Sequence, residues 1–116
     1  MQTVQIINAT KNTIIAQEGH LALSFEQRLR GLLGRTSLGT SEAMILNPCS
    51  SIHTLFMHFA IDVVFVDKNM QIVKIFEQLS PNRLTPIIWN AKLAIELPAG
   101  KINQTNTQIQ DKIELK

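Results

Sequence analysis

The stretch 61-IDVVFVDKNMQIVKIF-76 decides what kind of fold this chain adopts. It holds two runs, Ile61–Val66 and Gln71–Phe76, that are rich in β-branched and aromatic residues, which fit the pleated surface of a strand. Asp67-Lys68-Asn69-Met70 lies between them and is polar, and Asp and Asn tolerate the backbone conformations of tight turns. The stretch therefore predicts an antiparallel β-hairpin.

Further short apolar runs have the same character, and most are bounded by Asn, Gly, Pro or Asp. They are Val4–Ile7, Thr13–Ala16, Ala43–Leu46, Leu93–Leu97 and Lys112–Leu115. Together with the hairpin they predict seven strands, which leaves little room for helix in 116 residues. Pro81 and Pro86 place residues 80–90 in a long connection or an edge, because proline interrupts strand pairing. The expected fold class is mainly β, a sandwich or barrel.

One segment has helical spacing instead. Ser24 can cap a helix whose third position is Gln27. The apolar residues at helical spacing are Phe25, Leu29, Leu32 and Leu33. Gly31 and Gly34 then end the helix. We expect one short helix over about residues 25–32.

Length and composition indicate one domain, residues 1–116, because 116 residues with a 45% apolar fraction can enclose a single core. The net charge is +2, and the basic residues are scattered without a run. A nucleic-acid partner is not expected, because it would need clustered cations. A single cysteine cannot form an internal disulfide.

The start of the sequence predicts the location. It lacks the three features of a signal peptide, which are a basic start, an apolar core and a cleavage site of small residues. No apolar stretch in the sequence is long enough to span a bilayer. We therefore expect no transmembrane segment and a cytoplasmic location, with a trimmed exported domain as the alternative.

The segment from Cys49 to Asp62 holds the only cysteine, two of the three histidines and a carboxylate among mostly apolar residues. Cys49, His53 and Asp62 are ligand types for zinc and also the parts of a cysteine hydrolase. A structural zinc site normally has four ligands, and no second cysteine exists here, so we expect no metal and no cofactor. A lone cysteine in apolar surroundings is most often inert. His53 and Thr54 can equally be a hydrogen-bonded pair that anchors a bend.

Asp62 and Glu96 each interrupt an apolar strand. A carboxylate in such a setting needs a partner, and arginine is the natural bidentate one. The candidate partners for Asp62 are Arg28, Arg30, Arg35 and Arg83. Three interpretations stay open for these acids: internal anchors, groups that face a ligand, or a general acid/base pair. The glycines near Arg28 and Arg35 follow the helix, whereas phosphate loops precede one, which disfavours a phosphate site.

Several motifs carry a resemblance to a known family. They are Arg28, Gly31-Leu32-Leu33-Gly34-Arg35, Ile52-His53-Thr54-Leu55-Phe56-Met57, Ile61-Asp62-Val63-Val64-Phe65-Val66-Asp67 and Leu97-Pro98-Ala99-Gly100. From about residue 16 to the end, the chain resembles domain of unknown function 192, also catalogued as uncharacterised protein family 0127, in a branch with a Cys and Ile-His-Thr segment. The resemblance implies a small, mainly β, jelly-roll-like domain with one short helix and no agreed activity.

This chain departs from the family pattern at three places. Relatives of this branch tend to have Met-Arg-Phe-Pro-Ile-Asp where it has residues 57–62, MHFAID, and Pro-Trp-Arg where it has residues 81–83, PNR. The usual closing Gly-Asp appears as Gln110-Asp111. If the missing arginine or tryptophan lines a site, we expect this member to bind its ligand differently or not at all.

The leading hypothesis is a non-catalytic binding or accessory module with a polar pocket around His53 and Asp62, acting on a small ligand or a protein partner. The expected ligand-binding residues are Arg35, Cys49, His53, Thr54, Met57, Asp62, Arg83 and Glu96. One alternative is a small hydrolase or lyase that uses Cys49 or a His53 and Asp62 pair. The other is a structural polar network without a ligand.

Overall fold

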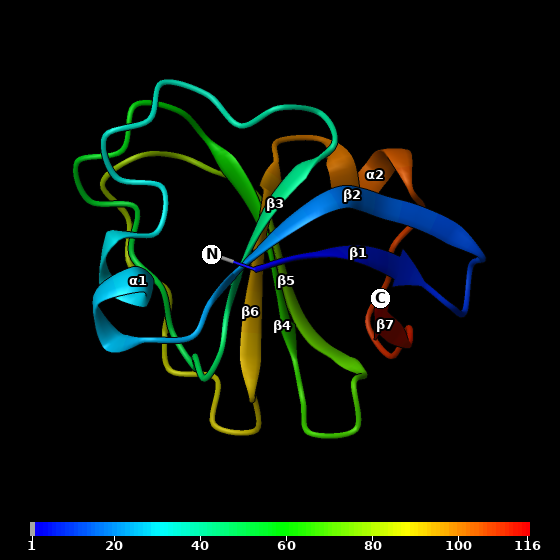
Figure 1. Cartoon of the computed structure of the whole chain (residues 1–116). Coiled ribbons are helices and arrows are strands. Elements are labelled where there is room, and N and C mark those ends of the chain that lie inside the picture. Colours follow the sequence, from blue (N-terminus) through cyan, green and yellow to red (C-terminus); the bar gives the residue numbers. More distant parts are fainter. Residues whose placement is uncertain (1) are drawn as a thin grey trace.

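The structure, a computed structural model, describes residues 2–116 and contains the seven strands that the sequence predicts (Figure 1). The strands are β1 (Thr3–Asn8), β2 (Thr13–Ala22), β3 (Glu42–Leu46), β4 (Ile61–Val66), β5 (Ile72–Leu79), β6 (Leu93–Pro98) and β7 (Ile113–Leu115). β2 and β5 are longer than their apolar runs, because β2 continues to pair as far as Ala22 and β5 continues past a bulge to Leu79, which pairs with Ile61. The mainly β fold class is therefore confirmed.

The predicted hairpin is confirmed as β4 and β5, with Val64 opposite Ile75. The carboxylate of Asp67 fixes the turn, because its Oδ1 accepts hydrogen bonds from the backbone N–H groups of Asn69 (2.9 Å) and Gln71 (3.0 Å). β4 also pairs with β6 on its other side, so all six of its residues are buried.

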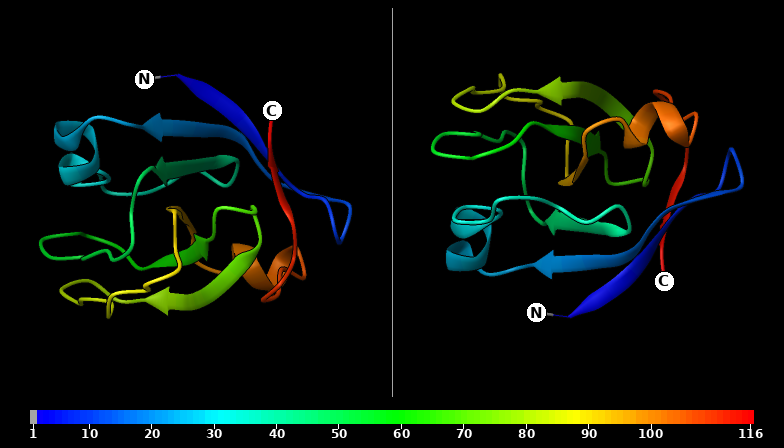
Figure 2. Two further views of the ribbon diagram at one scale, coloured as in Figure 1. Left: turned by 90° about the horizontal axis from the view of Figure 1, so that it is seen from below. Right: turned by 90° about the horizontal axis from the view of Figure 1, so that it is seen from above.

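All seven strands form one strongly curled sheet in the order β5-β4-β6-β3-β2-β1-β7 (Figure 2). At one end the two edges of this sheet meet. The backbone N–H of Ile72 donates to the carbonyl of Asp111 at 2.9 Å, and the N–H of Ile113 donates to the carbonyl of Met70 at 2.8 Å. The sheet therefore closes into a barrel at that end.

Gln110 stands where relatives of the family tend to have glycine. Its φ of 78° lies in a backbone region that favours glycine.

β2 and β3 run parallel, whereas the other named strand pairs are antiparallel. A parallel pair needs a crossover that returns to the other end of the sheet, and residues 23–41 form it. This crossover holds the helix α1 (Phe25–Arg30), which is shorter than the predicted 25–32 because the chain leaves the helix at Gly31 with a φ of 43°. The predicted cap is confirmed, since the Ser24 side chain accepts from the N–H of Gln27.

A second helix, α2 (Lys101–Gln104), was not expected from the sequence. It has four residues, too few for an apolar period to be visible. It begins after Gly100, whose φ of 94° suits the residue without a side chain. Among residues 2–116, no helix is long and apolar enough to cross a membrane.

The core has two layers, one on each face of β4 and β6. Val64, Val66 and Ile95 belong to the cluster inside the barrel, together with Ile6, Ile45, Ile72 and Ile113. Val63 and Phe65 alternate with these and belong to a second cluster, which Leu32, Ile52 and Met57 cover from outside. The crossover and the loops after β3 and β5 thus bury the outer face of the sheet, and this outer layer positions the candidate site.

Candidate functional site

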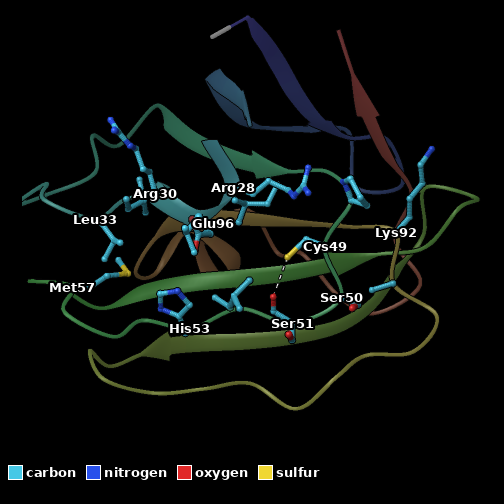
Figure 3. Close-up of a pocket in the computed structure, with 17 residues that line it drawn as sticks. Arg28, Arg30, Leu33, Cys49, Ser50, Ser51, His53, Met57, Lys92 and Glu96 are labelled. Carbon is cyan, nitrogen blue, oxygen red and sulfur yellow. Dashed lines mark hydrogen bonds between the residues drawn. The ribbon is translucent and has the colours of Figure 1, made fainter. Parts of the chain in front are cut away.

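A cavity of about 510 Å³ lies between the crossover and the loop after β3 (Figure 3). Residues 28–33, from α1 and the turn after it, line one side. Residues 48–53 line another. Leu46, Met57, Ala91, Lys92 and Glu96 complete the lining. The volume falls within the range of small-molecule sites in proteins.

Glu96 reaches this cavity because of its position in β6. Side chains alternate along a strand, so Glu96 points away from the barrel interior that Ile95 and Leu97 fill, and toward α1. A Cβ atom on Gly31 would lie only 3.5 Å from Glu96 Oε1, which places the carboxyl group directly beside the turn that ends α1. Glu96 is only 4% exposed.

The Glu96 carboxyl group is chemically unusual because it has no charged partner. Its Oε1 is buried and has no hydrogen-bond partner among residues 2–116. Burial raises the pKa of Glu96 from 4.5 to about 8, because an isolated carboxylate is poorly solvated there. At neutral pH the group is therefore mostly protonated, and it offers one O–H donor and acceptor capacity to whatever enters the cavity.

His53 is the second polar group in the cavity that lacks a partner. Its Nδ1 is buried without a hydrogen bond within the described chain. The backbone holds the residue in place, since His53 forms an isolated antiparallel bridge with Leu84. The flanking N–H of Ile52 also donates to Thr85 Oγ1 at 2.9 Å. In the view of Figure 3, Glu96 lies between Arg28 and His53.

Cys49 lines the same cavity and is half-buried. Its Sγ donates to the carbonyl of Ser51 at 3.1 Å, drawn as the dashed line in Figure 3. Burial is the largest influence on the Cys49 thiol and raises its pKa; a hydrogen bond between the Ser51 backbone and the thiolate and the charge of Arg28 oppose it, while an ionised Glu96 adds to it. The thiol form is therefore favoured, which is the opposite of what a nucleophilic cysteine needs.

Four of the predicted ligand-binding residues line the cavity: Cys49, His53, Met57 and Glu96. The other four, Arg35, Thr54, Asp62 and Arg83, lie outside its lining. Thr54 is fully buried and joins two loops, because its Oγ1 donates to the carbonyl of Ser80 at 2.7 Å and accepts from the N–H of Arg83 at 2.9 Å. The Arg83 side chain is exposed and donates to Ser80 Oγ at 3.2 Å.

Asp62 points to the opposite face of the sheet from Glu96. In the pairing of β4 with β6, Val63 lies opposite Glu96 and Asp62 lies opposite Leu97. Because neighbouring side chains of a strand alternate between the two faces, the two acidic side chains point to opposite faces of the sheet. Asp62 Oδ1 accepts from the N–H of Gln78 at 2.8 Å, and Oδ2 accepts from the N–H groups of Gly100 (3.1 Å) and Ile102 (2.9 Å). The expected arginine partner is replaced by backbone N–H groups, which explains how a 0% exposed aspartate is tolerated.

Arg35 belongs to a separate cluster on β2 and β3. Glu18, His20 and Glu42 have ligand atoms within 4.8 Å of one another, an arrangement that could hold a metal ion. Arg35 Nη2, however, lies 2.9 Å from Glu42 Oε1, and the N–H of Gly39 donates to the same oxygen. These hydrogen bonds lower the pKa of Glu42, with the Gly39 bond as the largest cause. The arginine thus supplies the positive charge that Glu42 needs.

Sequence reasoning missed that α1 forms one side of the cavity. Leu29 is 56% exposed and Leu33 is 38% exposed, although both are among the apolar residues at helical spacing. Arg28, Arg30 and Lys92 also line the cavity. Three arginines around a short helix were the available signal, but the macrodipole explains cations near a helix end equally well. Only the path of the crossover reveals that Arg28 and Arg30 line one cavity with Cys49 and His53.

Residues 6–115 match the family DUF192, described as an uncharacterized ACR. The chain belongs to the DUF192 family. A UPF0127 protein of Thermococcus sibiricus is 32% identical over 113 residues, which is 94% of this chain and 73% of that protein. A UPF0127 protein of Pyrococcus furiosus is 31% identical over 114 residues, 94% of this chain and 96% of that one. The DUF192 and UPF0127 assignment that the motifs indicated is confirmed.

A solved crystal structure also has a similar fold. The crystal structure of a protein of unknown function from Novosphingobium aromaticivorans has a TM-score of 0.83 and 20% sequence identity, covering 97% of this chain and 83% of that one. At this identity the match shows the fold alone. The relatives of this DUF192 chain are themselves uncharacterised, so the site must be interpreted from its own chemistry.

Proposed function

We propose that this DUF192 chain is a non-catalytic binding module whose cavity takes one small organic molecule. The observation that carries the proposal is the pair of buried atoms without partners, Glu96 Oε1 and His53 Nδ1, in the lining of one cavity. A buried polar atom without a hydrogen bond costs about 1–3 kcal/mol. A ligand that bonds to both atoms recovers this free energy, which gives it affinity and orientation.

The alternatives are supported less well. A cysteine hydrolase needs a thiolate, whereas burial favours the Cys49 thiol. A His53 and Asp62 pair would need the Asp62 oxygens, which already bind the N–H groups of Gln78, Gly100 and Ile102. The structural interpretation suits Asp62 and Thr54, but it leaves Glu96 and His53 unexplained. A nucleic-acid partner is not proposed, because the basic residues are scattered along the sequence, and a cytoplasmic location stays a prediction.

The test uses amide NMR spectra of the protein titrated with a set of small organic fragments that includes anions, neutral molecules and cations. We expect the fragments that bind to shift the amide signals of Gly31, Ser51 and Lys92, which line the cavity. Ser51→Trp places a large side chain at the exposed wall and should abolish these shifts. Ser37→Trp makes the same change at an exposed residue outside the lining and should retain them. Shifts that survive Ser51→Trp, or no cavity shift with any fragment, would overturn the proposal.

A further inference from the structure

The charges around the cavity narrow the chemistry of the ligand, an inference that rests on the proposed function. Three lining residues are basic: Arg28, Arg30 and Lys92. Glu96 is the acid among the lining residues, and burial keeps it mostly protonated at neutral pH. The lining therefore has a net positive charge when the cavity is empty, which favours an anion by Coulomb attraction.

The present interactions of the basic side chains are weak, so an anionic ligand can replace them. Arg28 Nη1 donates to the carbonyl of Leu23 at 2.6 Å, a neutral partner that leaves the guanidinium charge uncompensated. Arg30 pairs with Glu26 at 3.2 Å, but both side chains are about three-quarters exposed, at 77% and 75%. An exposed pair of this kind contributes about 0.3–0.5 kcal/mol, so a ligand can replace it at small cost. Lys92 is exposed, and none of the ion pairs within residues 2–116 includes it.

Apolar side chains form another part of the lining. Leu29 and Leu33 of the α1 side are 56% and 38% exposed, so they present hydrocarbon surface that a ligand can cover. Met57 continues this surface and is buried. Covering apolar surface contributes about 25 cal/mol per Å². The lining of the cavity thus combines basic side chains, an apolar wall and two buried polar atoms that lack hydrogen-bond partners.

We propose that the ligand is a small amphipathic organic anion, whose charged group pairs with Arg28, whose hydrocarbon part covers Leu29 and Leu33, and whose uncharged polar group bonds to Glu96 and His53. A protonated carboxyl group is complementary to an amide, because each offers one donor beside one acceptor. A cationic ligand would satisfy an ionised Glu96, but it would have to approach three like charges.

Three leucine derivatives test the charge preference: N-acetyl-L-leucine is an anion, N-acetyl-L-leucinamide is neutral and close to it in shape, and L-leucinamide, which lacks the acetyl group, is a cation. Titrations followed by the amide signals of Gly31 and Ser51 give each dissociation constant at neutral pH. We expect the anion to bind roughly tenfold more tightly than the neutral probe and the cation to bind most weakly. Arg28→Gln should remove most of the preference for the anion. Lys112→Gln removes the same charge at an exposed residue outside the lining and should leave the preference intact.

The pH dependence of anion binding tests the contribution of Glu96 to the affinity. Ionisation of Glu96 near pH 8 adds a negative charge beside the ligand, so the affinity for N-acetyl-L-leucine should fall by roughly tenfold as the pH rises through that value. Glu96→Gln keeps the shape and the hydrogen-bonding capacity but does not titrate. The other charged or titratable groups of the lining are Arg28, Arg30, Cys49, His53 and Lys92. All of them are unchanged in the variant, so its affinity should lack the fall near pH 8.

The outcomes separate this inference from the proposed function. Equal affinity for the three probes, or tightest binding of the cation, overturns the anion inference and leaves a binding module in place. An identical pH profile for the wild type and Glu96→Gln also overturns it. If none of the three probes shifts the cavity signals while other fragments do, the ligand class is wrong. If no fragment does, the proposed function is wrong as well.

Discussion

At the scale of single residues, Glu96 links the stability of the protein to pH. Its pKa is about 8 in the folded chain and 4.5 when the side chain is in water. The folded state therefore binds a proton that the unfolded state releases between these two values. The stability that depends on this proton is fully present below pH 4.5, and it is lost as the pH rises to about 8. Above that value the chain holds a buried, unpaired carboxylate, which is the costly form.

We expect Glu96→Gln to stabilise the protein increasingly as the pH rises, because glutamine stays neutral. The difference in the free energy of unfolding between the variant and the wild type should grow between pH 4.5 and about 8, by up to about 5 kcal/mol, and then stay constant. Urea unfolding at a series of pH values measures it. A difference that is independent of pH would show that Glu96 finds a partner in solution.

At the scale of secondary-structure elements, Asp62 joins three of them. It lies in β4, and its two carboxylate oxygens bind backbone N–H groups of β5 and of the start of α2. Those N–H groups lie at the positions where regular pairing is broken, since Gln78 has a φ of 51° and Gly100 precedes a helix. The carboxylate replaces the backbone partners that these groups lack.

Asp62→Asn should destabilise the fold by about 3 kcal/mol, because one acceptor oxygen becomes an NH₂ group that faces buried N–H donors. Asp67→Asn is a matched control, since Asp67 uses only Oδ1 and asparagine retains one oxygen. Its cost should stay below about 1 kcal/mol. Denaturant unfolding gives both values. Fragment binding to the folded Asp62→Asn variant should be unchanged, and a loss of cavity binding would instead assign Asp62 to the site.

At the scale of the whole molecule, the two ends of the chain close the barrel through a buried polar cluster. Asp111 is 4% exposed, and its carboxylate accepts from Asn8 Nδ2 at 2.9 Å, from the N–H of Gln108 at 2.8 Å and from Lys11 Nζ at 2.9 Å. Burial raises the pKa of Asp111, but the hydrogen bonds from Asn8 and Lys11 outweigh it, so the pKa is lowered overall. The stability from this site is therefore present above the ordinary aspartate range and is lost as the pH falls through the lowered pKa.

Asp111→Ala should destabilise the protein by about 3 kcal/mol, because it leaves the buried Asn8 amide and the N–H of Gln108 without their acceptor. Glu114→Ala is the control in the same segment. Glu114 forms an exposed pair with Lys116 at 3.6 Å, and its loss should change stability by less than about 1 kcal/mol. Thermal unfolding compares the two. If both variants melt together with the wild type, the polar cluster does not hold the barrel closed.

Features of the structure that arise from residues close together in the chain could be predicted from the sequence, whereas those that arise from distant residues could not. The strands and the Ser24 cap follow from side chains that are near one another in the chain, so they could be predicted. The order of the strands, and the register that sends Asp62 and Glu96 to opposite faces, depend on pairing between distant segments. For that reason the sequence placed both acids in one pocket, and the structure separates them. Cys49 and His53 were identified because polar groups in an apolar segment need an explanation.

The parallel pairing of β2 and β3 has a consequence for how such proteins diverge. The topology requires a long connection between these two strands, and in this chain the connection also supplies α1 and one wall of the cavity. Of its cavity-lining residues, Leu29, Arg30 and Leu33 are exposed, so they contribute little to the core. Mutation can therefore change the size and charge of the cavity along the crossover while every strand keeps its partner. The barrel supplies a constant scaffold, and this obligatory crossover is where the lining of the cavity is free to evolve.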